Sequence, residues 1–367
     1  MAAAIRVGIV GATVTPGGSG WGANAHVPAL HALPDFELKA VCTAHPETAE
    51  ASARAFGAAL AFHDIEQMAA HPEVDLVVVS VRVPWHRDLV MAGLSAGKAV
   101  FCEWPLGANL VEAEEMAGYA RDRGLRTAVG LQGRSDPAVR YAADLVARGD
   151  LGEILAANLS VMTQAAWERG SGRVWQRLRT NGANTLTIAG GHGIDAMCAI
   201  LGEFAEVSAR TATRVTEWLD TDAGELVPVD APDSIGLTGV LTNGIEVTVH
   251  VAAVPRPSGS RLEIYGRNGT LTLVSSGALS TGPNQIYAAL GDRELAPVPV
   301  PSEYTLVPEG TPSGSPRNVA QAYARLAEAF TAGAPFMPDF DHALTRHRLI
   351  DAIERSAATG QAIQLLR

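Results

Sequence analysis

The chain has 367 residues, enough for about two domains at the usual size of roughly 100–200 residues each. It carries 28 Lys and Arg residues against 39 Asp and Glu residues, which gives a formal net charge of −11, and like charges do not cluster in runs. An acidic chain without a basic patch is a poor partner for nucleic acid or for an anionic membrane surface. Since no apolar run approaches the length of a membrane span, we expect no membrane partner.

The three cysteines, Cys42, Cys102 and Cys198, are widely spaced and lie in apolar surroundings. An odd number without metal-ligand spacing argues against a disulfide framework, and we expect no metal site. The N-terminal residues pass too quickly into strand and glycine signals for a secretory signal. These features predict a reducing, cytoplasmic location.

The first third of the chain alternates apolar strand patterns with helical patterns. We expect strands at residues 5–10, 36–42, 74–80, 99–102 and 126–131, and helices at about 23–33, 49–56, 87–96 and 110–123. The run 74–80 is apolar on both faces, as in a buried parallel strand. The alternation predicts a doubly wound parallel sheet, an α/β Rossmann domain, over residues 1–130.

A glycine-rich loop joins the first strand to the first helix. It begins at Gly11 and continues to Gly22. Strand, glycine loop and helix start together offer backbone N–H groups and a helix dipole to a pyrophosphate. The match is imperfect because Thr13 occupies the second glycine position and the loop is long, although Gly20 and Gly22 could supply the later glycines. An ordinary glycine-rich loop is the alternative.

The end of the second strand bears on the choice of dinucleotide. NAD-binding units usually place an acid there to hold the ribose diol. This chain has Thr43, Ala44 and His45 instead, and Glu47 lies in the following turn. A 2′-phosphate would be tolerated beside Thr43 and His45, but no arginine is present to bind it, so the cofactor is expected to be NAD or NADP.

A short corner, Glu103-Trp104-Pro105, follows the strand at residues 99–102. It therefore falls at the carboxyl edge of the predicted sheet, where open α/β sheets bind their ligands. An acid and an aromatic residue before proline make a stiff corner aimed at that edge. A strand-to-helix turn with a packing tryptophan is the alternative.

The pattern changes after residue 131. A helix at 136–148 is followed by long β-rich runs at residues 154–164, 205–214, 234–241, 245–254, 261–265 and 270–274. Asn243-Gly244 and Asn268-Gly269 are hairpin signals. Residues 131–367 are thus predicted to form an α+β domain with a large open antiparallel sheet, whose outer face meets solvent or another copy of the chain. Helices at about 318–331 and 341–357 and a strand at 362–366 end the chain.

A second polar cluster lies around His192, which follows two glycines and opens a helical run through Leu201. A neutral imidazole at a domain cleft can exchange a proton with a carbinol; a histidine satisfied within the core is the alternative. Asp195 is expected to cap or pin backbone. The polar loops with aromatics at 167–177 and 181–184 suit a carbohydrate-like ligand, or are simply solvated.

Ordered landmarks along essentially the whole chain resemble the Gfo/Idh/MocA family, the glucose–fructose oxidoreductase and inositol dehydrogenase group. They are the Gly11 loop with residues 26–30, residues 74–78 with His86, and residues 103–106, 134–137, 149–154, 190–195 and 266–271. The resemblance implies an N-terminal Rossmann domain and a C-terminal open sheet often used for dimers or tetramers. It also implies hydride transfer between NAD or NADP and a sugar, cyclitol or related hydroxyl compound.

The departures from the family pattern are informative. Family enzymes have Glu-Lys-Pro, whose lysine helps bind the cofactor and polarise the substrate oxygen; here that position is Trp104, and an indole has one N–H donor and no charge. Ile188 replaces an aspartate, and Arg82 replaces a proline. The pattern resembles the subgroup related to the fungal inhibitor of the galactose transcription activator, so a non-catalytic dinucleotide- or sugar-responsive regulator is the alternative function.

The patterns and the resemblance together imply three groups of site residues and no metal ligand. The expected catalytic residues are His192 and Trp104. The expected cofactor-binding residues are Gly11, Thr13, Gly20, Trp21, Thr43, His45, Ser80, Arg82, His86, Glu103, Trp104 and Gln132. The expected substrate-binding residues are Gln132, Arg173, Trp175, Asn184 and His192.

Overall fold

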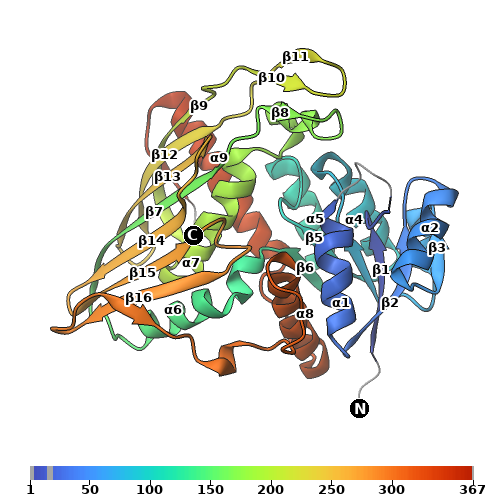
Figure 1. Ribbon diagram of the computed structural model, residues 1–367, viewed down its shortest axis with the longest axis horizontal. Helices are drawn as coiled ribbons and strands as arrows, with labels where there is room; N and C mark the ends of the chain where they lie inside the picture. The colour runs from blue at the N-terminus through green and yellow to red at the C-terminus, as the bar shows by residue number, and fades with distance from the viewer. Residues whose placement is uncertain (1–3, 15–19, 366–367) are drawn as a thin grey trace. The chain divides into compact units, whose positions relative to one another are not determined.

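The computed structural model describes residues 4–14 and 20–365. The chain divides into two compact units, each made of two stretches of sequence. The first comprises Met1–Leu131 and Leu306–Thr345, and the second comprises Gln132–Thr305 and Arg346–Arg367. Figure 1 shows the course of the chain through both units.

The first unit contains a parallel sheet, as predicted. Its six strands are β1 (Ile5–Val10), β2 (Phe36–Cys42), β3 (Leu60–Phe62), β4 (Leu76–Val79), β5 (Ala99–Glu103) and β6 (Thr127–Gly130). Their order is β3-β2-β1-β4-β5-β6, so the strand order reverses between β1 and β4. That reversal is the topological switch point of a doubly wound sheet, where such folds bind their ligands. The edge strand β3 was not predicted, because three residues are too few to show a periodic pattern.

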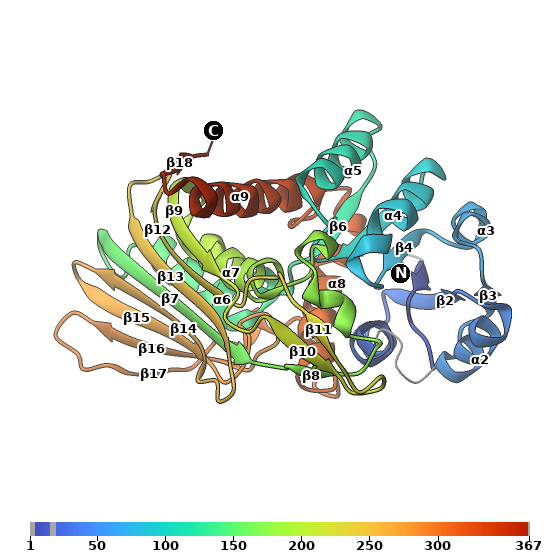
Figure 2. The ribbon, with the colours of Figure 1, turned by 90° about the horizontal axis from the view of Figure 1, so that it is seen from above.

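Helices cover this sheet. They are α1 (Val27–Ala32), α2 (Pro46–Phe56), α3 (Ile65–Ala70), α4 (His86–Ser95), α5 (Leu110–Asp122) and α8 (Ser315–Ala332). Figure 2 shows α3, α4 and α5 on one side of the sheet and α8 on the other. Helix α8 follows the strands of the second unit in sequence, yet it packs on α1 and contributes Val319, Tyr323 and Leu326 to the apolar core of the first unit.

The second unit is built on a nine-stranded sheet of order β17-β16-β15-β14-β7-β13-β12-β9-β18. The strands are β7 (Ile154–Gln164), β9 (Phe204–Ala212), β12 (Ser234–Leu241), β13 (Glu246–Val254), β14 (Gly259–Gly266), β15 (Gly269–Ser275), β16 (Asn284–Leu290), β17 (Ala296–Val298) and β18 (Ile363–Gln364). Both predicted hairpins are confirmed, since β12 pairs antiparallel with β13 and β14 with β15. One pair, β7 with β13, runs parallel within this otherwise antiparallel sheet.

One face of the large sheet is buried and the other is exposed. In β13, Val247 and Val249 are buried, whereas Thr248 and His250 between and beside them are exposed. Helices α6 (Pro137–Ala147), α7 (Gly191–Leu201) and α9 (Phe340–Thr359) lie along the buried face, as Figure 2 shows. The alternation of the sequence therefore predicted the correct buried side of this sheet.

A small sheet of order β11-β10-β8 completes the second unit. Its strands are β8 (Glu168–Arg169), β10 (Glu217–Asp220) and β11 (Glu225–Pro228). They were not predicted, because two to four residues are too few to show a periodic pattern. The Arg169 guanidinium lies 4.0 Å from the centre of the Trp218 ring, and the Ser171 hydroxyl donates to Asp220 at 2.8 Å. Among the described helices, none is long and apolar enough to cross a membrane.

Candidate functional site

The backbone after β1 passes very close to the end of β4. Gly11 has φ +98°, and a Cβ atom there would lie 2.1 Å from the Ser80 carbonyl oxygen. A Cβ atom on Gly22 would lie 3.0 Å from the Ala12 nitrogen. Only glycine allows the two backbone segments to come this close. The approach occurs at the switch point of the sheet, where dinucleotide-binding folds use glycine so that the backbone can come close to the pyrophosphate. Residues 15–19 of the loop lie outside the described residues.

The near side of the glycine loop is held by a neighbouring helix. The buried hydroxyl of Ser52 on α2 accepts from the Val14 backbone N–H at 3.1 Å. Sequence reasoning missed Ser52, because a serine in a helix carries no signal of its partner. Gly20 is less constrained than Gly22, since its Cβ atom would meet only the flexible end of Asn24 at 3.1 Å.

The first helix of this unit starts in an unusual conformation. The predicted helix at 23–33 is a π-helical segment, η1 (Gly22–His26), followed by α1. Trp21 stands at its N-cap position and is half-buried. Since π-helical turns are rare and occur frequently at functional sites, this segment supports the view that the loop before it binds a ligand.

The end of β2 is closed by a hydroxyl network. The Thr43 hydroxyl lies 2.6 Å from the Thr48 hydroxyl and donates to the His45 carbonyl at 3.1 Å. The His45 side chain is exposed at the start of α2. This edge therefore presents a neutral turn and an imidazole, as the sequence suggested.

His86 occupies the interior behind the Glu-Trp-Pro corner. One ring nitrogen lies 2.8 Å from the Pro105 carbonyl oxygen, and the other lies 3.2 Å from the Val81 carbonyl oxygen. Burial lowers the pKa of His86, so the ring is neutral near pH 7. His86 thus contacts the backbone of the Glu-Trp-Pro corner on its buried side. Arg82, four residues earlier, is exposed.

The corner itself lies at the carboxyl end of β5. Trp104 is only 5% exposed, and the Trp104–Pro105 peptide bond is cis. Glu103 is 9% exposed, and its carboxylate lies 2.9 Å from a ring nitrogen of His26. Glu103 ends β5 and Trp104 follows it, at the same edge to which β1 and β4 deliver Gly11 and Ser80, as predicted.

In the second unit, a capped π-helical segment leads into α7. This segment is η6 (Thr185–Gly190), and the Asn184 side-chain oxygen accepts from the Leu186 and Thr187 backbone N–H groups at 2.9 and 3.2 Å. The Asn184 side-chain oxygen is therefore used for capping, and the amide nitrogen is the donor of this side chain. The capping box fixes where α7 begins.

His192 is the second residue of α7 and is half-buried. Helix α7 runs close to β7, since a Cβ atom on the neighbouring Gly193 would lie 2.7 Å from a Val161 methyl group. The glycines around His192 therefore permit close helix–sheet packing. They place the His192 imidazole at the start of a helix that packs directly against the sheet.

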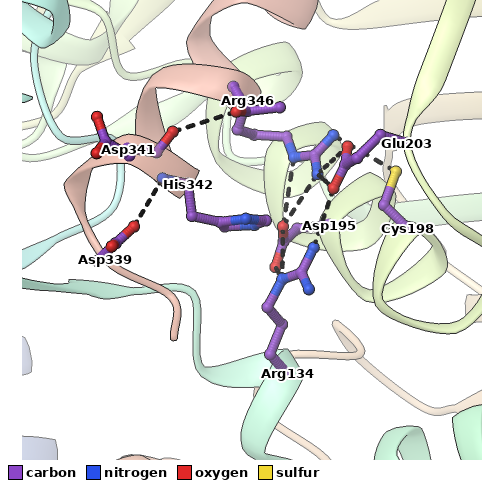
Figure 3. Close-up of polar contacts among 9 residues, drawn as sticks. Arg134, Asp195, Cys198, Glu203, Asp339, Asp341, His342 and Arg346 are labelled. Atoms are coloured by element: carbon purple, nitrogen blue, oxygen red, sulfur yellow. Dashed lines mark hydrogen bonds and ion pairs between the residues drawn. The ribbon is translucent and has the colours of Figure 1, made fainter. Parts of the chain in front are cut away.

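Asp195, one turn after His192, is the centre of a charged cluster. Figure 3 shows the guanidinium groups of Arg134 and Arg346 reaching it from two sides. Arg134 Nε lies 3.0 Å and Arg346 Nη2 lies 3.2 Å from its carboxylate, and both arginines also contact Glu203. We expected Asp195 to cap or pin backbone; the structure shows it bound to side chains of η3 (Gln132–Ser135) and α9, which anchors α7 to both.

The cluster is electrically balanced. Burial is the main cause that raises the pKa of Cys198 to about 12, so this thiol beside Arg346 is neutral at pH 7. Two guanidinium groups then face two carboxylates, and the sum of their charges is zero. Arg346 was not predicted, because an arginine within a helical pattern is normally a solvated one.

The remaining expected substrate residues belong to the second unit. Gln132 is 2% exposed and opens η3, two residues before Arg134. Arg173 is exposed, and Trp175 is half-buried with its carbonyl accepting from the Asn181 side chain at 2.6 Å. Within residues 4–14 and 20–365, no cluster of His, Cys, Asp and Glu could hold a metal ion.

Comparison with known proteins agrees with this arrangement. Residues 5–131 match the model of the Gfo/Idh/MocA oxidoreductase family, NAD-binding Rossmann fold, and residues 137–275 match the model of the Gal80p C-terminal domain. Dehydrogenase aclE from Aspergillus oryzae is 33% identical over 375 residues, covering 98% of each chain.

Two solved structures have the same fold. A super-repressor mutant of Gal80p from Saccharomyces cerevisiae has a TM-score of 0.87 at 23% identity, covering 99% of this chain and 98% of that chain. Levoglucosan dehydrogenase in complex with NADH and L-sorbose has a TM-score of 0.83 at 23% identity, covering 100% of both.

The backbone approach of Gly11 to Ser80 at the switch point and the second unit with its nine-stranded sheet define a two-unit protein with a dinucleotide-binding fold. The chain belongs to the Gfo/Idh/MocA family of oxidoreductases, which has an NAD-binding Rossmann fold. Its second unit is similar to the C-terminal domain of Gal80p. The expected family, subgroup resemblance and fold are therefore confirmed.

Proposed function

We propose that the protein is an NAD- or NADP-dependent oxidoreductase acting on a hydroxyl group of a sugar, a cyclitol or a related compound. The observation that carries the proposal is the backbone cradle at the switch point, where Gly11 and Ser80 leave no room for a side chain. A full-length relative named as a dehydrogenase supports the reaction class, and a structural neighbour bound to NADH and L-sorbose supports the substrate class.

The first unit would hold the dinucleotide, and the second unit would bind substrate and form the oligomer. When bound, the nicotinamide supplies a hydride acceptor or donor. The residues proposed to hold the dinucleotide are Gly11, Thr13, Gly20, Trp21, Thr43, His45, Ser80, Arg82, Glu103, Trp104 and Gln132, with His86 acting through Pro105. The neutral edge at Thr43 admits a ribose diol or a 2′-phosphate, so both dinucleotides are candidates.

The second unit would supply the proton chemistry. The His192 imidazole takes the proton of the substrate hydroxyl in oxidation and returns it in reduction. The side chains proposed to orient the substrate hydroxyls and ring are Gln132, Arg173, Trp175 and Asn184. Trp104 would form a wall beside the reacting carbon.

Trp104 sets a limit on the rate. A lysine ammonium stabilises a developing alkoxide, and loss of such a charged stabiliser commonly costs about a hundredfold or more. The indole replaces it with one neutral donor. The reaction is therefore either an easier oxidation or a slow one.

The test is the absorbance of the reduced nicotinamide across a panel of sugars and polyols, with each dinucleotide. The variant His192→Ala should lower kcat by about a hundredfold or more. His31→Ala changes an exposed histidine on α1 and should leave kcat unchanged. Unchanged turnover in His192→Ala would remove the proposed acid–base role.

A second candidate is a regulator that binds a dinucleotide or sugar without turnover. Two observations favour it, namely Trp104 in place of the family lysine and the match of residues 137–275 to the Gal80p C-terminal domain. Thermal shift with each dinucleotide, beside the turnover panel, separates the two functions. Binding with no turnover on any compound would support the regulator.

We also propose a homodimer or homotetramer formed through the exposed face of the large sheet. That face carries exposed Thr248 and His250 in its centre and half-buried Met162 and Tyr265 nearby. Light scattering after gel filtration tests the proposal, and a monomer at micromolar concentration would refute it. The three buried free cysteines support a cytoplasmic location, which cell fractionation would check.

A further inference from the structure

Three buried polar side chains form a continuous chain within the first unit. The Tyr323 hydroxyl on α8 lies 2.7 Å from His26 Nδ1, and His26 Nε2 lies 2.9 Å from Glu103 Oε1. Tyr323 and His26 are fully buried, and Glu103 is 9% exposed. The three residues come from three separate elements, so tertiary folding alone creates this chain.

One arrangement of protons satisfies both contacts with a single donor each. Burial is the main cause that raises the pKa of Tyr323, so its hydroxyl keeps its proton and can donate. An ionised carboxylate can only accept, so the Glu103 carboxylate requires a proton on His26 Nε2. With the proton on Nε2 and none on Nδ1, Nδ1 accepts from the Tyr323 hydroxyl. In that arrangement each hydrogen bond has one donor and one acceptor, and the direction runs from Tyr323 through His26 to Glu103.

The third member of this hydrogen-bonded series, the Glu103 carboxylate, is confined at the carboxyl edge of the sheet. A Cβ atom on Gly130 of β6 would lie 2.4 Å from Glu103 Oε1, so the carboxylate lies directly over that glycine. The rings of His26 and Phe101 meet edge to face at 5.5 Å, which restricts rotation of the imidazole. Glu103 is thus held by its neighbouring strand and by His26.

Such a network is not required for packing. Buried polar groups cost free energy unless their bonds are complete, and apolar side chains of similar volume often stabilise as well or better. What a complete network adds is a defined orientation of its members. The member at the carboxyl edge is Glu103, which directly precedes Trp104.

We propose that His26 and Tyr323 are positioning residues that orient Glu103, and through it the Trp104 corner, for dinucleotide binding. The inference rests on the proposed function, because it assigns the corner to the dinucleotide site. It gives α8, which comes from the far end of the chain, a direct part in organising that site.

Two substitutions at one position separate orientation from packing. In His26→Gln the amide nitrogen reaches the place of Nε2 and can still donate to Glu103. In His26→Asn the side-chain amide lies at the place of Nδ1, so the variant keeps the hydrogen bond to Tyr323 and loses the hydrogen bond to Glu103. Both remove a ring from the same buried site and should lower stability similarly.

We expect His26→Gln to keep the dinucleotide Kd within about threefold of wild type, and His26→Asn to raise it about tenfold or more, because one bond to a charged group is lost. Tyr323→Phe removes the hydroxyl that is bonded to His26 and should raise the dinucleotide Kd about threefold. Tyr119→Phe removes a tyrosine hydroxyl bonded near the surface, to Ser95 at 3.3 Å, and should change nothing.

The measurement is calorimetric titration with NAD, NADP and their reduced forms at a temperature where every variant is folded. Equal affinities of His26→Gln and His26→Asn would overturn the inference while leaving the proposed function intact. If wild type binds no dinucleotide, the proposed function fails as well. Should His26→Asn not fold, an unchanged Kd in Tyr323→Phe would itself overturn the inference.

Discussion

Replacing Arg346 by methionine should strongly destabilise the second unit. Methionine is unbranched and apolar, so it can fill the buried space of the arginine stem but cannot pair with a charge. The arginine contributes contacts of 3.2 Å to Asp195 and 2.8 Å to Glu203. Its removal leaves one guanidinium, that of Arg134, facing two carboxylates.

The magnitude follows from burial. The side chains of Arg346 and Asp195 are each 1% exposed, whereas that of Glu203 is 34% exposed and can regain water. The cost therefore falls mainly on Asp195, and removing one partner of a buried ion pair costs about 3–5 kcal/mol. Since domain stability is about 5–15 kcal/mol, the loss is a large fraction of the total.

Urea unfolding followed by circular dichroism measures this loss. The matched control is Arg355→Met on the same helix, where the guanidinium lies 3.5 Å from Asp351 and both side chains are well exposed. Such a surface pair contributes at most about 0.5 kcal/mol. A loss below about 1 kcal/mol for Arg346→Met, or a loss equal to that of the control, would refute the role given to the cluster.

Three further outcomes are expected. Gly11→Ala should abolish dinucleotide binding and lower Tm further than the control Gly57→Ala. Both glycines have positive φ, but only at Gly11 would the added Cβ atom also lie 2.1 Å from a backbone carbonyl oxygen, that of Ser80. Equal losses of Tm would contradict the close approach of Gly11 to Ser80. Thr43→Asp should favour NAD over NADP by about tenfold or more in Kd, since a carboxylate binds the ribose diol and repels a 2′-phosphate; an unchanged ratio would place the ribose elsewhere. The lowered pKa of His86 means that, below about pH 6.5, His86 binds a proton in the unfolded state but not in the folded state, so the free energy of unfolding decreases as pH falls. His86→Gln should reduce the slope of unfolding free energy against pH in that range by up to about 1.4 kcal/mol per pH unit. An unaltered slope would show that His86 is charged in the folded protein.

Local patterns were enough to predict most of the architecture. Strands such as β1 and β7 matched their expected bounds, because period and residue type report burial directly. The hairpins at residues 243–244 and 268–269 followed from turn chemistry, which needs no distant partner. The Gly11 loop and the corner at Trp104 were predicted for the carboxyl edge of the sheet because parallel strands deliver their ends to one side.

What the sequence could not show were the pairings between distant segments. The bond from Tyr323 to His26 joins residues 297 positions apart, and the contact of Arg346 with Asp195 spans 151 positions. Neither pairing leaves a trace in periodicity, since a buried arginine in α9 looks like a surface one until its partners are known. The short strands of the small sheet, the parallel pairing of β7 with β13 and the packing of α8 on the first unit likewise depend on long-range contacts. Composition and period determined which segments become buried helices and strands; the tertiary structure decided which polar groups meet inside them, because that choice is made by hydrogen bonding and desolvation among residues that are far apart in the chain.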